Sequence, residues 1–210
     1  KREVSRRKRC LSDDDFLSAR VADDLISAGG VGRFSAVALD KLLAGKAVAV
    51  RPFINAIDEG MGGGSTPQDI ETMFQLIYLR FTQPRADPTS FAAMTSQALG
   101  LLANRVASPD VVFNQAIDAI LSRNSPRRRP ETSATVGQWS LEKSLAFYKA
   151  RLADASHFTF VFVGSFTPES IKPLVETYLA SLPATKAHET WRDFGVTPPR
   201  GVIEKTIEKG

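Results

Sequence analysis

The sequence predicts an α+β fold, with one mixed, largely antiparallel sheet and helices packed on one face. Two stretches repeat apolar residues at the i, +3, +4, +7, +8 and +11 spacing of helices that lie on a core. An apolar run at residues 158–163 is typical of a strand covered on both faces. The two helical stripes are Ile70, Met73, Phe74, Ile77, Tyr78 and Phe81, and Ile171, Leu174, Val175, Tyr178, Leu179 and Leu182.

The first third of the chain is predicted to hold two helices and a strand. Ser12 and the aspartates after it suit the start of a helix that runs to about Ala28. Ser35 can cap a short second helix that ends near Leu43. A strand region follows at residues 46–61, in which Pro52 marks a bend, a bulge or a sheet edge.

Glycine and proline divide the rest of the chain into segments. "GMGGGSTP" at residues 60–67 is predicted as a loop, and it has neither the spacing nor the lysine of a phosphate-binding loop. Thr66 and Pro67 then start a helix that ends at Pro84. Further helices are expected at about 88–105, 109–123 and 140–152.

The stretch "FTFVFVGSFTPESIKPLVETYLASLP" at residues 158–183 is predicted as a strand, a turn at Gly164 and a helix. Thr167 caps this helix and Pro168 opens it, while Pro173 is expected to cause a small irregularity. A linker and a short alternating segment, "VIEKTIEKG", end the chain. We therefore expect a basic tail at 1–11, one domain at 12–183, and a linker with the first strand of a following domain at 184–210.

Charge and composition exclude several classes of protein. Residues 1–9 carry a net charge of +5, whereas the whole chain carries +4, so the body is close to neutral and a nucleic-acid surface is not expected. The single cysteine, Cys10, excludes an internal disulfide and a cysteine zinc cluster. No apolar run is long enough to span a bilayer, and the basic start lacks the apolar segment of a signal peptide.

Three stretches together resemble the pitrilysin/insulinase family of zinc metallopeptidases, the inverted zincins. Residues 160–183 resemble the strand-turn-helix that closes each domain in that family. Residues 39–87 resemble the start of the second half of the bacterial, periplasmic-type members, which have two homologous halves in one chain. Residues 190–210 resemble the connector to the next domain. The resemblance implies a pitrilysin-like domain at 12–183, with its opening strands replaced by the unrelated first ten residues.

The zinc motif that defines this family is missing. An H-x-x-E-H helix places two histidines one turn apart on a zinc ion, and its glutamate activates the bound water. By the resemblance, Arg20 and Asp24 stand at the two histidine positions and Asp23 at the glutamate position. Arginine stays protonated and cannot ligate zinc. The helix at 91–105, which would hold the further ligand, has no carboxylate. No catalytic, cofactor-binding or metal-binding residue is therefore expected here.

Other candidate sites have weaker support. His157 and the linker residue His188 could be metal ligands, but each stands in a separate segment. Residues 13–15 are three aspartates that could bind calcium, although they fit a helix start better. Residues 127–129, three arginines, could contact acidic groups of a peptide or form a solvated loop. No G-x-S-x-G elbow is present, and a serine triad cannot be recognised from sequence alone.

The resemblance implies a non-catalytic, zinc-free domain that helps to form a closed substrate chamber for a zinc metallopeptidase. Peptide hydrolysis, and the zinc, would then belong to another domain. The expected partners are the catalytic half, on the same or a neighbouring chain, and a peptide substrate. The resemblance also suggests a periplasmic location. The alternative is an inactive relative that serves as a structural or assembly subunit.

Overall fold

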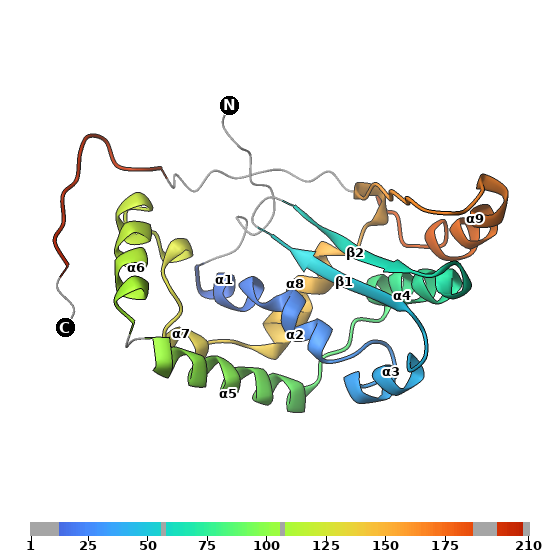
Figure 1. Ribbon diagram of the computed structural model, residues 1–210, viewed down its shortest axis with the longest axis horizontal. Coiled ribbons are helices and arrows are strands. Elements are labelled where there is room, and N and C mark those ends of the chain that lie inside the picture. The colour runs from blue at the N-terminus through green and yellow to red at the C-terminus, as the bar shows by residue number, and fades with distance from the viewer. Residues whose placement is uncertain (1–12, 56–57, 106–107, 187–196, 208–210) are drawn as a thin grey trace.

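The computed structural model describes residues 13–55, 58–105, 108–186 and 197–207. This part of the chain is mostly helical and has one two-stranded antiparallel sheet, so the α+β class is confirmed, although the sheet is smaller than expected (Figure 1). The main helices are α1 (Asp13–Arg20), α2 (Ala22–Ala28), α3 (Ala36–Leu42), α4 (Ile70–Thr82), α5 (Pro88–Arg105), α6 (Pro109–Leu121), α7 (Ser133–Val136), α8 (Leu141–Arg151) and α9 (Pro168–Leu174).

The helix predicted up to Ala28 is broken in two. Val21 separates α1 from α2 and has φ −113° and ψ 9°, outside the helical region. Ala22, Leu25 and Ile26 of α2 are buried, and α2 lies against both α8 and strand β1 (Val48–Ile54). Ser35 caps α3 as predicted, because its side chain accepts a hydrogen bond from the Ala38 N–H at 3.3 Å.

The glycine-rich segment predicted as a loop is a strand. β2 (Glu59–Ser65) pairs with β1 in a regular antiparallel register that runs from Val48 opposite Ser65 to Ile54 opposite Glu59. A Cβ on Gly63 would lie 2.3 Å from the Ala49 carbonyl oxygen, so glycine is required there for the strands to approach. Close pairing with β1 thus outweighs the low strand propensity of glycine. Pro52 lies in β1 at the sheet edge, one of its three predicted places.

Helix α4 is the centre of the core. It follows a 3-10 turn at Pro67–Asp69, close to the predicted start, and buries Met73, Phe74, Ile77 and Phe81 of the predicted stripe. The expected cap differs, because the Thr66 hydroxyl donates to the Asp69 carboxylate at 2.9 Å and makes no hydrogen bond to a backbone N–H. α4 contacts both strands and the π-helical turn at Val175–Leu179.

The segment Phe158–Val163 is extended but forms no strand, contrary to the prediction of a central, covered one. Its phenylalanines pack on α4, with ring centroids 5.0 Å apart for Phe74 and Phe162 and 5.0 Å for Phe81 and Phe158. The other face is open, since Val161 is 78% and Val163 is 95% exposed. Within the described residues this segment pairs with no strand. Its phenylalanines face the core and its valines face solvent, as in a strand, but without the hydrogen bonds of a sheet.

The last predicted helix has the expected start and irregularity. Thr167 accepts from the Ser170 N–H in a capping box, and Pro168 occupies the first turn. Two residues beyond Pro173, the helix widens into a π-turn in which the Ala180 N–H donates to the Val175 carbonyl at 2.9 Å.

The described residues near the C-terminal end form no strand. The part of the predicted C-terminal strand that the structure describes, residues 202–207, is not paired, and Val202 is 90% exposed. Its assignment to a following domain stays a prediction. The basic tail, Cys10 and His188 lie outside the described residues. Among the described helices, none is both long and apolar enough to cross a membrane.

Candidate functional site

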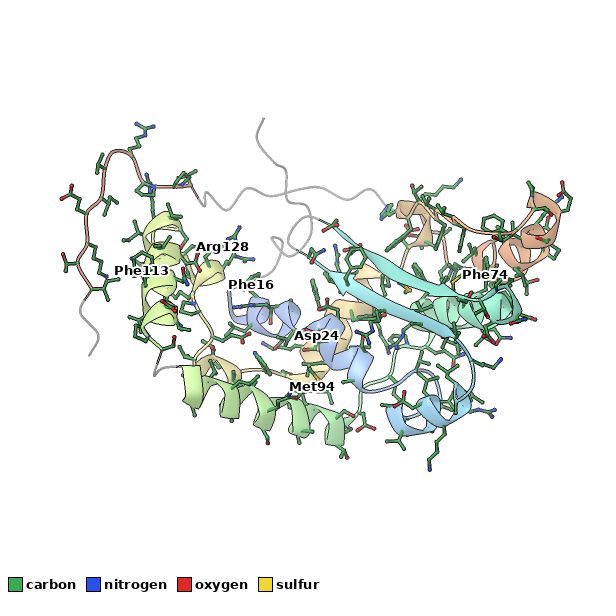
Figure 2. The ribbon with its side chains drawn as sticks, viewed as in Figure 1. Phe16, Asp24, Phe74, Met94, Phe113 and Arg128 are labelled. Carbon is green, nitrogen blue, oxygen red and sulfur yellow. The ribbon has the colours of Figure 1, made fainter. Side chains whose placement is uncertain are left out.

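The three positions of the expected zinc motif do not share one helix. Arg20 is the last residue of α1, whereas Asp23 and Asp24 lie in the first turn of α2 (Figure 2). The break at Val21 falls between the two positions that would hold histidines. The one-turn spacing that brings two imidazoles to one zinc ion requires a continuous helix, so the backbone here departs from the motif as well as the side chains.

Arg20 and Asp23 contact other segments of the chain. The Arg20 guanidinium lies 3.8 Å from the Glu131 carboxylate, and its Nη1 donates to the Arg129 carbonyl at 3.4 Å. The Asp23 carboxylate accepts a hydrogen bond from the Ile54 N–H at 2.9 Å. Arg20 therefore ties α1 to the segment after α6, and Asp23 ties α2 to the end of β1.

The other charged clusters also have structural contacts. Lys143 Nζ lies 2.8 Å from the Asp15 carboxylate, which connects the aspartate cluster to α8. Arg127 stacks on the Phe16 ring, with its guanidinium carbon 4.8 Å from the ring centroid. Arg128 and Arg129 are exposed (Figure 2). In the described part of the chain, no group of three or more His, Cys, Asp or Glu side chains could hold a metal ion.

His157 lies beside a buried carboxylate. Asp154 accepts hydrogen bonds from the Ser156 and Thr185 N–H groups, both at 3.0 Å, and from both hydroxyls at 2.6 Å. The imidazole Nε2 of His157 is 3.8 Å from the same carboxylate. This hub joins the start of the extended segment to Thr185, which follows the π-helical turn at Val175–Leu179, and the sequence did not reveal it.

A second buried polar pair holds α4 to its neighbours. Tyr148 is fully buried and its hydroxyl donates to the Arg80 carbonyl at 3.3 Å. The Arg80 guanidinium donates from Nη1 to the Gly30 carbonyl at 3.3 Å. Burial raises the pKa of the Tyr148 phenol and lowers the pKa of the Arg80 guanidinium. Because both groups hydrogen-bond to backbone across element boundaries, we assign them a role in positioning α4.

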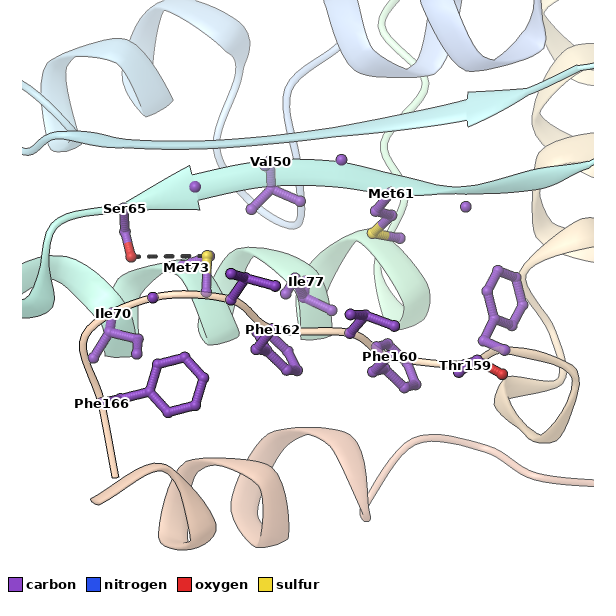
Figure 3. A pocket seen from close by; sticks show the side chains of 18 of the residues that line it. Val50, Met61, Ser65, Ile70, Met73, Ile77, Thr159, Phe160, Phe162 and Phe166 are labelled. Atoms are coloured by element: carbon purple, nitrogen blue, oxygen red, sulfur yellow. Dashed lines mark hydrogen bonds between the residues drawn. The ribbon is translucent and has the colours of Figure 1, made fainter. Parts of the chain in front are cut away.

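A groove of about 590 Å³ lies beside β2. One wall is β2 itself, and the other is the stretch His157–Phe166 (Figure 3). Its floor is one face of α4, formed by Ile70, Met73, Ile77 and Phe81. We call this the β2 groove. Its ionisable lining residues are Glu59 and His157, so most of the lining is apolar side chain and peptide backbone.

Sequence reasoning missed the β2 groove because both of its walls were assigned differently. Glu59–Ser65 was predicted largely as loop, and Phe158–Val163 was predicted to be covered by neighbouring strands. The one available signal was the alternation of phenylalanine with Thr159, Val161 and Val163, which allows one face to pack on a helix while the other stays open.

Comparison with known proteins gives a consistent relationship. Residues 138–209 match the family described as the peptidase M16 inactive domain. The chain is 22% identical over 209 residues to the probable zinc protease PqqL of Haemophilus influenzae, covering 93% of this chain and 22% of the relative. The chain thus spans about a fifth of the length of that relative.

Solved protease structures have the same fold. The periplasmic protease PqqL of Escherichia coli matches with a TM-score of 0.76 at 18% identity, over 93% of this chain and 21% of that chain. A protease from Helicobacter pylori matches with a TM-score of 0.69 at 11% identity, over 94% of this chain and 48% of that chain. The predicted resemblance is confirmed: residues 138–209 match the peptidase M16 inactive domain, and the chain as a whole is similar to a probable zinc protease and has the fold of solved proteases.

Proposed function

We propose that this chain is a non-catalytic, zinc-free domain of a zinc metallopeptidase and helps to form the closed chamber in which another domain hydrolyses peptides. The proposal is supported by the residues and the backbone at the positions that the resemblance assigns to the zinc motif. Arg20 and Asp24 stand where two imidazoles are needed, and Val21 interrupts the helix between them.

The chemistry of the motif positions supports a role without catalysis. A protonated guanidinium at position 20 repels a divalent cation and has no lone pair to donate. The Asp23 carboxylate is held by the Ile54 N–H, and a general base would instead have to face a metal-bound water. A catalytic zinc site uses three protein ligands, and without the metal no water of low pKa is available for attack.

The partners follow from the same proposal. The catalytic half of a peptidase, on the same or a neighbouring chain, would hold the zinc and the H-x-x-E-H helix. A peptide substrate would be enclosed between the two halves. The match of residues 138–209 to a domain described as inactive, in a chain similar to a probable zinc protease, supports this division of labour.

The proposal is tested by expressing this chain with and without an H-x-x-E-H segment encoded beside it. Each sample is stripped of metal, titrated with zinc by calorimetry and given a mixture of quenched fluorogenic peptides. We expect this chain alone to bind no zinc at submicromolar concentration and to cleave nothing. We expect the pair to cleave peptides in a zinc-dependent manner, with kcat/KM at least tenfold above that of the catalytic segment alone.

Two results would overturn the proposal. Chelator-sensitive cleavage by this chain alone would mean that it is a catalytic domain. An equal kcat/KM for the catalytic segment with and without this chain would remove the chamber role. The second result, combined with stable binding between the two, would favour a structural or assembly subunit instead.

A further inference from the structure

We propose that the β2 groove binds an extended peptide as an inserted β-strand, which joins β2 to the segment Thr159–Val163 in one continuous sheet. The occupant is an uncharged stretch of about seven residues from a separate chain, with apolar side chains at every second position. The inference does not rest on the chamber role proposed above, because it concerns only residues of this chain.

Backbone groups on both walls support an inserted strand. β2 pairs with β1 on one side, and its other edge has no strand partner among the described residues. Across the groove, Thr159–Val163 is extended, and within the described part of the chain no backbone hydrogen bond joins it to another segment. Two rows of peptide N–H and C=O groups therefore border one cavity. A β-strand is the ligand that offers complementary groups on both of its edges.

The floor determines which side chains the strand should carry. Ile70, Met73, Ile77 and Phe81 recur along one face of α4 below the groove. Above it, the groove opens to solvent beside Gly62 and Gly64, where an added Cβ would meet nothing within 4 Å. A strand turns alternate side chains to opposite faces, so apolar residues would face α4 and polar residues would face water.

The directions of the walls favour one orientation of the occupant. Figure 3 shows Met61 and Thr159 at one end of the groove and Ser65 and Phe166 at the other, so the two walls run in the same direction. A strand that runs the opposite way is antiparallel to both. Antiparallel pairing is the slightly more stable arrangement per residue, and it requires no crossover connection. Seven residues of β2 correspond to a strand about 23 Å long.

The test uses a labelled peptide, acetyl-Thr-Val-Thr-Ile-Thr-Val-Thr, attached through a flexible glycine-serine linker to a fluorophore. Binding to the whole chain is measured by fluorescence anisotropy. Two variants of the peptide are N-methylated, one at the odd inner positions and one at the even positions. Because N–H groups of successive residues point to opposite neighbours, each variant blocks one wall of the groove. We expect saturable binding of the parent peptide and at least tenfold weaker binding of both variants.

Hydrogen exchange and a spin label locate the peptide. Bound peptide should slow amide exchange in β2 and in Thr159–Val163, with exchange in α5 and α6 unchanged. A nitroxide at the peptide N-terminus should broaden the amide signals of Ser65 and Phe166 more than those of Met61 and Thr159. Met61→Lys, which places a charge in the groove, should weaken binding at least tenfold, while Val202→Lys at a 90% exposed position should leave it unchanged.

Several results would overturn the inference. If neither N-methylated peptide binds more weakly than the parent, the peptide is held by apolar contacts alone. If only one of them binds more weakly, the peptide pairs with one wall of the groove and not with both. Absence of saturable binding would exclude a peptide from a separate chain. Concentration-dependent dimerisation with protection of the same amides, in the absence of peptide, would assign the groove to a second copy. The peptide measurements use the unaltered chain, so they remain decisive if Met61→Lys fails to fold.

Discussion

Phe74→Ala tests whether α4 holds the domain together. The Phe74 side chain is fully buried, and its ring stacks on Phe162 at 5.0 Å with an interplanar angle of 18°. It also lies 6.4 Å, centroid to centroid, from the Tyr178 ring. This side chain of α4 thus contacts the extended segment and the π-helical turn at Val175–Leu179, so truncation weakens the packing of α4 on two other segments.

The expected loss in the free energy of unfolding is about 3–5 kcal/mol. Burial of a phenylalanine side chain contributes about 1.5–3 kcal/mol by transfer from water. The cavity that remains, and the loss of aromatic pairs worth about 0.5–1.5 kcal/mol each, bring the total to the usual range for a buried phenylalanine. For a domain of this size, that loss lowers Tm by roughly 6–20 °C.

The assay is urea unfolding followed by far-ultraviolet circular dichroism, with Phe113→Ala as the matched control. Phe113 lies on α6 and is 56% exposed, so the same change there should cost no more than about 0.5 kcal/mol. The midpoint should fall for Phe74→Ala while the m-value stays constant, because the surface exposed on unfolding is similar. A loss below about 1 kcal/mol for Phe74→Ala would mean that this face of α4 is solvated and would refute the packing described above.

Three further predictions concern polar groups. Hydrogen bonds from the Ala47 N–H and the Thr66 hydroxyl lower the pKa of Asp69, so in acid the unfolded chain binds more protons than the folded one. The free energy of unfolding should therefore fall as the pH drops below about 4. Asp69→Asn should make this pH dependence weaker in urea titrations at pH 2–7. An unchanged acid profile in the variant would contradict this. Asp154→Ala should cost about 2–4 kcal/mol in the same assay, because buried donors lose a charged acceptor, and a loss below about 0.5 kcal/mol would exclude the hub. The double variant Arg20→His, Asp24→His should bind no zinc at submicromolar concentration in calorimetry, because the helix is interrupted at Val21 between the two histidines. Tight zinc binding would show that α1 and α2 can form one continuous helix.

Much of the helical framework could be predicted from local signals. The stripe on α4, the proline at the start of α9 and the serine caps of α3 and α8 depend on neighbours within a few residues, which the sequence displays directly. Long, periodic helices with defined caps are therefore predictable. The break at Val21 was not predictable, because α1 and α2 separate to satisfy contacts with α8 and β1, which are distant in the chain.

The strands show the limit of the same reasoning. Glycines at 60 and 62–64 normally indicate a loop. They form a strand here because β2 pairs with β1, whose backbone lies too close to Gly63 for a side chain. Phe158–Val163 has the composition of a strand that is buried on both faces. Such burial depends on neighbouring strands, and the local sequence does not show whether these are present. Buried groups such as Asp154 likewise depend on partners 31 residues away, including Thr185.

The absence of the zinc motif and the groove beside β2 have different structural consequences. At the positions that the resemblance assigns to the motif, Arg20 and Asp23 have contacts to other segments, so a zinc site built there would require these contacts to be replaced as well as the ligands. At the β2 groove, by contrast, the apolar floor and the two backbone edges are already in place. A strand would enter there without breaking a hydrogen bond between described residues, because neither facing edge is paired. If this chain binds a peptide, we therefore expect it at the β2 groove and not at the positions that the resemblance assigns to the zinc motif.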